Sequence, residues 1–184
     1  MTEKTHGTTG IAFGLAAAGA YAPNIIEKTA SGPSIMSVVT LGLITFGIFA
    51  GSLYPDIDHS ESILNGDEFM MDWEDKLEHR GVTHTIINAL GVLLPFAIVF
   101  ALIKLFTNWN TEPLIAFAAS FAVGCLWHMV LDSFTPKGVM WLYPITLFRF
   151  RIPIVRNYIS ELIFALVVNV GLLILAANLW AKIF

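Results

Sequence analysis

Long runs of apolar residues, separated by short polar segments, dominate this sequence. Five such runs can be distinguished, at residues 9–22, 35–54, 85–106, 113–134 and 159–181. The last four have roughly the 20 residues that an α-helix needs to cross the hydrocarbon core of a bilayer. The first is shorter and rich in Gly and Ala, which suits a tightly packed span or a re-entrant segment; a cleaved signal peptide is a further alternative. The pattern predicts an all-α, polytopic membrane bundle of about four to five transmembrane helices.

The composition also indicates a membrane-embedded protein. Of the 184 residues, 56% are hydrophobic and only 13% are charged, which is about half the charged share of a soluble domain. The length suits a single domain over residues 1–184. The net charge of -4, without any basic block, argues against a nucleic-acid partner.

The few polar motifs are rich in histidine and aspartate. Four of the five histidines lie in three motifs beside the apolar runs, PDIDH at 55–59, HRGVTH at 79–84 and HMVLD at 128–132. Imidazoles and carboxylates are ligands of zinc, manganese and iron. Because such groups are costly beside membrane-spanning segments, they are functional candidates by default.

Threading the chain through five crossings places these motifs on one side of the membrane. The N-terminal segment with His6, the loops 55–84 and 133–158, and the end of the fourth span all fall on that side. The same side carries seven of the ten Lys and Arg residues, so the positive-inside rule predicts that it faces the cytoplasm. We therefore expect one composite site at the cytoplasmic interface.

Two of the motifs contain residue pairs that are spaced to act together. Asp56 and Asp58 are one residue apart, so an extended turn would point both carboxylates the same way; the alternative is an Asx-type turn at a helix end. His128 and Asp132 lie one helical turn apart on the same face and can share an ion, or the carboxylate can orient the imidazole; the alternative is a hydrogen-bonded pair at a helix end. Both pairs are candidate metal ligands, and Asp56 or Asp58 is also the candidate general base.

The middle motif adds two histidines and an arginine. His79 and His84 converge if Gly81 lets the chain turn before the next helix begins, and we expect Thr83 to cap that helix. The alternative is two separate interfacial histidines. Arg80 is a candidate catalytic residue, because the guanidinium fork binds phosphate or carboxylate groups through two hydrogen bonds.

Taken together, these residues outnumber the ligands of one tetrahedral ion. They suit one or two divalent transition-metal ions with a bridging carboxylate. Without a thiolate in the set, we expect zinc first, with manganese or iron as alternatives. The candidate ligands are His6, Asp56, Asp58, His79, His84, His128 and Asp132.

Two connecting segments have distinct compositions. Residues 60–78 are acidic, and we expect a solvated insert loop or an amphipathic helix. Residues 133–158 mix aromatic side chains with arginines, which is typical of the headgroup level of a bilayer. We expect an interfacial segment that contacts lipid phosphates, with Lys137 and Arg149 as candidates for substrate binding.

The ordered motifs resemble a known family. LYPDIDH at 53–59, HRGVTH at 79–84, and HMVLD at 128–132 followed by FTPKGV at 134–139 are similar to the YdjM-like inner-membrane family of predicted metal-dependent hydrolases, and THG at 5–7 is similar to the start of that family. This resemblance covers nearly the whole chain. It implies a bacterial or phage-encoded inner-membrane protein with a metal-hydrolase site, although the acidic insert at 60–78 is rather long for the family.

We therefore expect a membrane-embedded, metal-dependent hydrolase. Metal-activated water would attack a phosphoester, or an acyl ester or amide, of a lipid or a membrane-proximal small molecule. The alternatives are a divalent-metal transporter or channel, which would place ligands near the middle of the membrane, and a regulatory membrane protein with a closed, structural metal site. The oligomeric state stays open.

Overall fold

The structure is a bundle of long helices. It is a computed structural model that describes residues 1–26, 34–58 and 82–183. Within that part of the chain there is no β-strand, and only Val139 and Phe150 form an isolated β-bridge. The helices are α1 (Glu3–Ile26), α2 (Ile35–Leu53), η1 (Tyr54–Asp58), η2 (Val82–His84), α4 (Ile86–Gly91), α5 (Leu93–Phe106), α6 (Glu112–Asp132) and α7 (Tyr158–Trp180).

Five helical stretches are long and apolar enough to cross a membrane, as the sequence pattern predicts. They include α1, which has 24 residues and is therefore long enough to span rather than a short re-entrant piece. Helices α4 and α5 follow each other as one span, residues 86–106, with a break at Val92. The expected polytopic, all-helical membrane bundle is confirmed.

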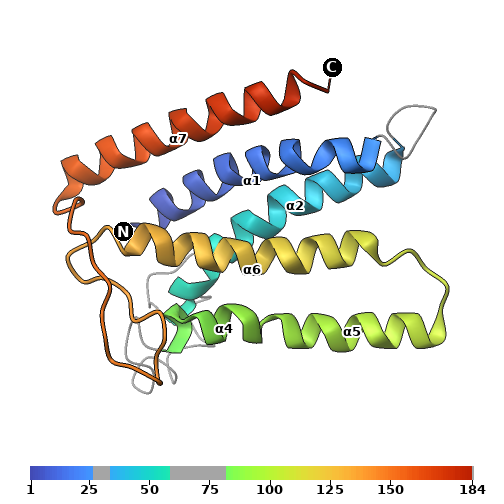
Figure 1. Cartoon of the computed structure of the whole chain (residues 1–184), viewed down its shortest axis with the longest axis horizontal. Helices are drawn as coiled ribbons and strands as arrows, with labels where there is room; N and C mark the ends of the chain where they lie inside the picture. Colours follow the sequence, from blue (N-terminus) through green and yellow to red (C-terminus); the bar gives the residue numbers. More distant parts are fainter. Residues whose placement is uncertain (27–33, 59–81, 184) are drawn as a thin grey trace, which may run out of the picture.

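The helices pack side by side in an order that differs from their order in the chain. Figure 1 shows α7, α1, α2, α6 and α5 as neighbours, and the most extensive contacts join α2 to α6, α1 to α2 and α1 to α7. Only 6% of the α4–α5 span and 6% of the α7 span is buried inside the protein. These two outer helices therefore bury few residues inside the bundle and expose much of their surface to the surrounding lipid.

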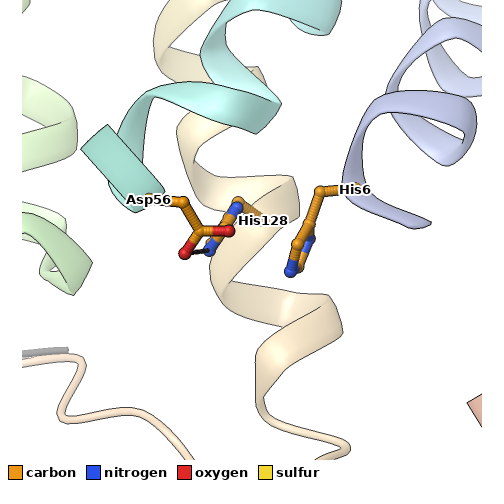
Figure 2. Close-up of side chains that lie close together, drawn as sticks. All are labelled: His6, Asp56 and His128. Atoms are coloured by element: carbon orange, nitrogen blue, oxygen red, sulfur yellow. Dashed lines mark ion pairs between the residues drawn. The ribbon is translucent and has the colours of Figure 1, made fainter. Parts of the chain in front are cut away.

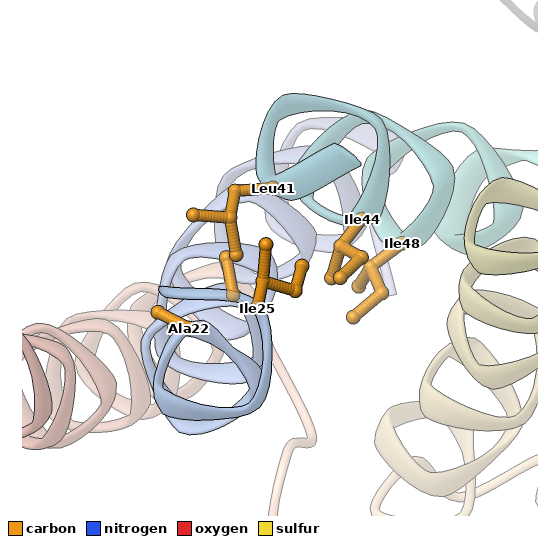
Figure 3. Close-up of a cluster of buried hydrophobic side chains, with 6 residues drawn as sticks. Ala22, Ile25, Leu41, Ile44 and Ile48 are labelled. Atoms are coloured by element: carbon orange, nitrogen blue, oxygen red, sulfur yellow. The ribbon is translucent and has the colours of Figure 1, made fainter. Parts of the chain in front are cut away.

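The two ends of the bundle differ in chemistry. At one end, which we call the Met1 end, α1 and α7 begin, α2 and α6 end, and α4 begins (left in Figure 1). Toward the opposite end, α1 and α2 share an apolar core that includes Ala22, Ile25, Leu41, Ile44 and Ile48 (Figure 3). The polar motifs of the sequence come together at the Met1 end.

Helices α2 and α6 approach each other closely because glycines face each other where they cross. A Cβ atom on Gly51 would overlap the carbonyl oxygen of Phe121, and a Cβ atom on Gly124 would overlap the carbonyl oxygen of Ile48. Small residues give membrane helices this close backbone contact. The contact fixes the end of α2 against the last turns of α6, where two of the sequence motifs lie.

Replacing Gly124 by leucine should therefore separate α2 from α6. We expect destabilisation on the order of 3 kcal/mol or more, because overpacking a contact that is already at backbone distance forces the helices apart. Thermal unfolding of the purified protein in detergent measures the effect. Gly171→Leu on α7 is the matched control, since a Cβ atom at that position would have no neighbour within 4 Å among the described residues. Equal stability of the two variants would contradict the close α2–α6 contact.

Candidate metal centre

Four separate segments bring five histidine and aspartate side chains together at the Met1 end. His6 comes from α1, Asp56 from η1, His84 from η2, and His128 and Asp132 from the last turns of α6. All are fully buried except Asp56, whose side chain is 14% exposed. Figure 2 shows His6 and Asp56 on either side of His128, with the three side chains directed toward a common centre.

Three of these side chains form a nearly equilateral triangle of ligand atoms. The Nε2 atoms of His84 and His128 are 3.1 Å apart, and each lies 3.4 Å from Asp56 Oδ1. Ligands that bind one tetrahedral ion at 2.0–2.1 Å are separated from each other by ~3.3 Å. The triangle therefore has the size of one face of a zinc coordination tetrahedron.

Asp132 lies between this triangle and His6. Its Oδ2 atom is 3.8 Å from the Nε2 atoms of both His84 and His128, and its Oδ1 atom is 3.2 Å from His6 Nε2. The α-amino group of Met1 also donates to Oδ1, at 2.7 Å. The ligand atoms form two overlapping groups, one with His6 and one with Asp132, that share His128. The two carboxylate oxygens of Asp132 thus face different imidazoles, Oδ1 toward His6 and Oδ2 toward His84 and His128.

The two histidines of the triangle are oriented by hydrogen bonds at their other ring nitrogens. His128 Nδ1 donates to the backbone carbonyl of Ser52 at 2.7 Å, which leaves Nε2 of the neutral ring with a lone pair that faces the cluster. His84 Nδ1 pairs with the Thr83 hydroxyl at 2.9 Å. Hydrogen bonds of this kind fix the tautomer and the ring orientation of metal-ligating histidines.

The expected capping role of Thr83 is wrong. Thr85 caps α4, because its side chain accepts the backbone N–H of Asn88 at 3.0 Å. The helix begins later than the sequence pattern suggests, since η2 continues as far as His84. Thr83 is therefore outside the helix, and its hydroxyl is directed at His84 instead.

His6 has the environment that is hardest to explain without a bound cation. Its ring is stacked on His128 with centroids 3.7 Å apart. Both of its ring nitrogens are buried, and neither makes a hydrogen bond of good geometry among the described residues, although Nε2 lies 3.2 Å from Asp132 Oδ1. Buried polar atoms are nearly always paired, and a metal ion would satisfy the ring. The residues therefore fit a transition metal, and burial favours the required neutral imidazoles: it lowers the pKa of His84.

The remaining candidates from the sequence lie either outside the described residues or on an exposed segment. The side chain of Asp58 and the whole of His79 and Arg80 lie outside the described residues, so their roles stay predictions. Lys137 and Arg149 are exposed on the segment 133–157, which follows α6 at the Met1 end. Because their side chains carry only donors, neither is a metal ligand, and both stay candidates for substrate binding.

Sequence reasoning also missed residues that support the cluster. The Ser52 contact is made by a backbone carbonyl, which carries no sequence signal. Glu161 at the start of α7 accepts the backbone N–H of Thr2 at 2.6 Å and the hydroxyl of Thr5 at 2.8 Å. This carboxylate ties α7 to the turn of α1 that carries His6, and an acidic residue in the first turn of a helix offers no hint of that partner.

The chain is similar to a small set of known proteins. The family model described as YdjM inner membrane protein matches residues 1–183, so the chain belongs to this family. The Uncharacterized protein YvsG of Bacillus subtilis (strain 168) is 29% identical over 157 residues, which cover 84% of this chain and 79% of that protein. The Inner membrane protein YdjM of Escherichia coli (strain K12) is 34% identical over 107 residues, which cover 55% of this chain and 49% of that protein. The protein of the same name in Shigella flexneri matches with the same identity and coverage. No solved structure matches the chain.

Removing one imidazole of the triangle should abolish metal binding. His84→Ala and His128→Ala should each lower the metal affinity by more than the roughly 10- to 100-fold that loss of an orienting residue costs. Elemental analysis of the purified variants after dialysis measures the metal content. Cys125→Ser is the control, because this buried residue of α6 lies close to His128 in the chain and contributes to neither ligand group. Full metal content in both histidine variants would show that the ion, if any, binds elsewhere.

Proposed function

We propose that this protein is a membrane-embedded, metal-dependent hydrolase that cleaves a phosphoester of a lipid or of another membrane-proximal substrate. The triangle formed by Asp56, His84 and His128 is the observation that carries the proposal. Three protein ligands around an open position are typical of catalytic metal sites, whereas structural sites are closed by four ligands. Zinc suits the mixed His and Asp ligand set best, with manganese or iron as alternatives.

A transition metal in this site would supply a Lewis acid that lowers the pKa of bound water to about 7. The protein side chains would share the remaining tasks. His128 holds its Nε2 lone pair toward the centre, because its Nδ1 donates to the carbonyl of Ser52. His84 would do the same as the tautomer whose Nδ1 donates to the hydroxyl of Thr83. Asp132, between the triangle and His6, is suited to bridge two ions if two are bound.

Asp56 is the best-placed general base among the described residues. Its side chain is 14% exposed while the other four ligands are fully buried, so substrate and water would approach from its side. A carboxylate at the open side of the cluster can accept the proton that water loses. Asp58 keeps its candidacy for the same role from the sequence.

Two features support this substrate class, the position of the cluster and the charges around it. The ligands come from the ends of membrane spans, which places them near the level of lipid headgroups. Lys137 and Arg149 are exposed at the same end, and Arg80 neighbours the candidate ligand His79 in the chain. These cations suit a phosphoester better than a neutral ester, because Arg binds phosphate groups bidentately.

Metal transport is the weaker hypothesis. A transporter is expected to bind its ion near the bilayer midplane, where discontinuous helices meet. The five ligands come instead from the Met1 end of the bundle. A purely structural metal in a membrane protein without hydrolytic activity is the second rival, and turnover by the metal-loaded protein separates it from catalysis.

We also propose that the Met1 end faces the cytoplasm, as the distribution of seven of ten Lys and Arg residues supports. Sealed inside-out vesicles should then cleave a water-soluble, short-chain phospholipid added from outside, and sealed right-side-out vesicles should not. The reverse result would place the site on the other face of the membrane.

Hydrolysis itself is tested with the metal-loaded protein in nanodiscs. Phospholipids should release a phosphorylated or dephosphorylated headgroup, and a chelator should stop the reaction. Asp56→Asn should slow turnover by about 10²- to 10⁴-fold, the usual contribution of a general base. Arg80→Lys keeps the charge but loses the fork, and should cost on the order of 10²-fold with unchanged metal content.

Arg156→Lys is the matched control for Arg80→Lys. Arg156 is exposed at the same end, where its guanidinium donates only to the carbonyl of Pro153 among the hydrogen bonds of the described residues. Its replacement should leave turnover unchanged. A metal-loaded wild-type protein that cleaves neither phosphoesters nor acyl esters would favour the structural-metal alternative, and cleavage of acyl esters alone would correct the substrate class.

A further inference from the structure

We propose that the seam between the α4–α5 span and α6 binds the hydrocarbon chain of a membrane lipid whose headgroup lies at the metal centre. The seam is the groove between α6 and the α4–α5 span, and at its far end residues of α1 and α2, such as Tyr21 and Ile48, also line it. The proposal rests on the proposed function and deepens it, because it names the part of the substrate that the hydrolase would hold away from the reacting bond. The cavities along these helices, their ends and the exposure of α5 support it.

Three cavities follow one another along the seam and share lining residues. The first, of about 390 Å³, is lined by residues that include Tyr54, Asn88 and Phe96. The second, of about 280 Å³, shares Phe96 with the first and is floored by Ala118 and Ala119 of α6. The third, of about 610 Å³, shares Phe100 and Ala119 with the second. Because neighbouring cavities share these lining residues, we infer that they join into one groove.

One end of the groove adjoins the metal centre. Tyr54 lines the first cavity and begins η1, the short helix that carries Asp56. Asn88 lines the same cavity, and its side-chain nitrogen donates to the carbonyl of Thr83 at 3.0 Å. Thr83 in turn contacts the His84 ring at 2.9 Å. A chain lying in the groove would therefore present its polar end beside two of the metal ligands.

The groove has the length and lining that a lipid chain requires. From Asn88 to Lys104 the α4–α5 span rises by ~24 Å at 1.5 Å per residue, most of the roughly 30 Å hydrocarbon core. Between these ends, the second cavity is lined only by Leu, Phe, Ala and Ile. Polar side chains return at the far end, where Lys104, Asn110 and Glu112 line the third cavity. The walls thus exclude a polar solute from the middle of the groove.

Lipid is the occupant that the surroundings favour. Helix α5 has no buried residue, so the groove opens sideways to whatever medium surrounds the spans. The small side chains of Ala97 and Ala119 leave room between the helices, and both residues are exposed where they line the second cavity. Because the lining helices are membrane spans, that medium is hydrocarbon, and a chain can enter from the bilayer without crossing water.

Photolabelling in nanodiscs tests the proposal without relying on turnover. The metal-loaded protein is reconstituted in phosphatidylglycerol containing a fraction of the same lipid with a diazirine in one acyl chain, and adducts are mapped by peptide mass spectrometry. Adducts should concentrate on Phe96, Phe100 and Ala119 rather than on the equally lipid-facing α7. Ala119→Trp should reduce labelling of the two phenylalanines by about tenfold or more, since excluding only two CH₂ groups from an apolar site weakens binding by about that factor.

Ala101→Trp on α5 is the matched control, because this alanine is exposed and lines none of the three cavities. If Ala119→Trp does not fold, Ala97→Trp fills the groove from its opposite wall. Two outcomes would overturn the seam proposal, whether or not the protein hydrolyses lipids. One is uniform labelling across α5, α6 and α7, and the other is equal labelling in the filled and control variants. Protection of the seam by a second copy, seen as α5–α5 cross-links, would overturn it as well. Concentrated labelling without hydrolysis would support the seam and reject the hydrolase.

Discussion

Burying three imidazoles and two carboxylates at the end of an apolar bundle is the main energetic constraint on this protein. Isolated carboxylates are very costly to bury, and unpaired ring nitrogens are costly too. His6 stacks on His128, and among the described residues its Nδ1 has no hydrogen-bond partner, while its Nε2 lies 3.2 Å from Asp132 Oδ1. The ligand atoms of Asp56, His84 and His128 nevertheless stay 3.1 to 3.4 Å apart, a spacing that a shared cation explains directly.

The packing of the bundle serves this cluster. Gly51 and Gly124 let α2 and α6 touch at backbone distance, and the carbonyl of the next residue of α2, Ser52, reaches the ring of His128. Glu161 ties the first turn of α7 to the first turn of α1. Helix α5, by contrast, is held loosely and buries no residue. Tight contact thus holds the ligands in place, and loose contact leaves the groove that leads to them.

Much of this arrangement could be predicted from the sequence, for identifiable physical reasons. Apolar runs near 20 residues predict the membrane spans. The chain crosses the bundle twice between His6 and Asp56, and twice between His84 and His128, so all four residues return to the same end. The position of Asp132 between His6 and the other two imidazoles could not be predicted, because i,i+4 spacing allows either ligation or hydrogen bonding. The partner of His128 is a backbone carbonyl, and Thr83 faces His84 only because α4 begins two residues later than expected.

Direct ligation of a transition metal by this histidine and aspartate cluster is the central claim. X-ray absorption spectroscopy of the purified, metal-loaded protein tests it most directly. We predict a first shell of nitrogen and oxygen atoms at about 2.0–2.2 Å, together with the outer-shell scattering of at least two imidazole rings. A sulfur scatterer at about 2.3 Å, or a shell of oxygen atoms without imidazole, would contradict it.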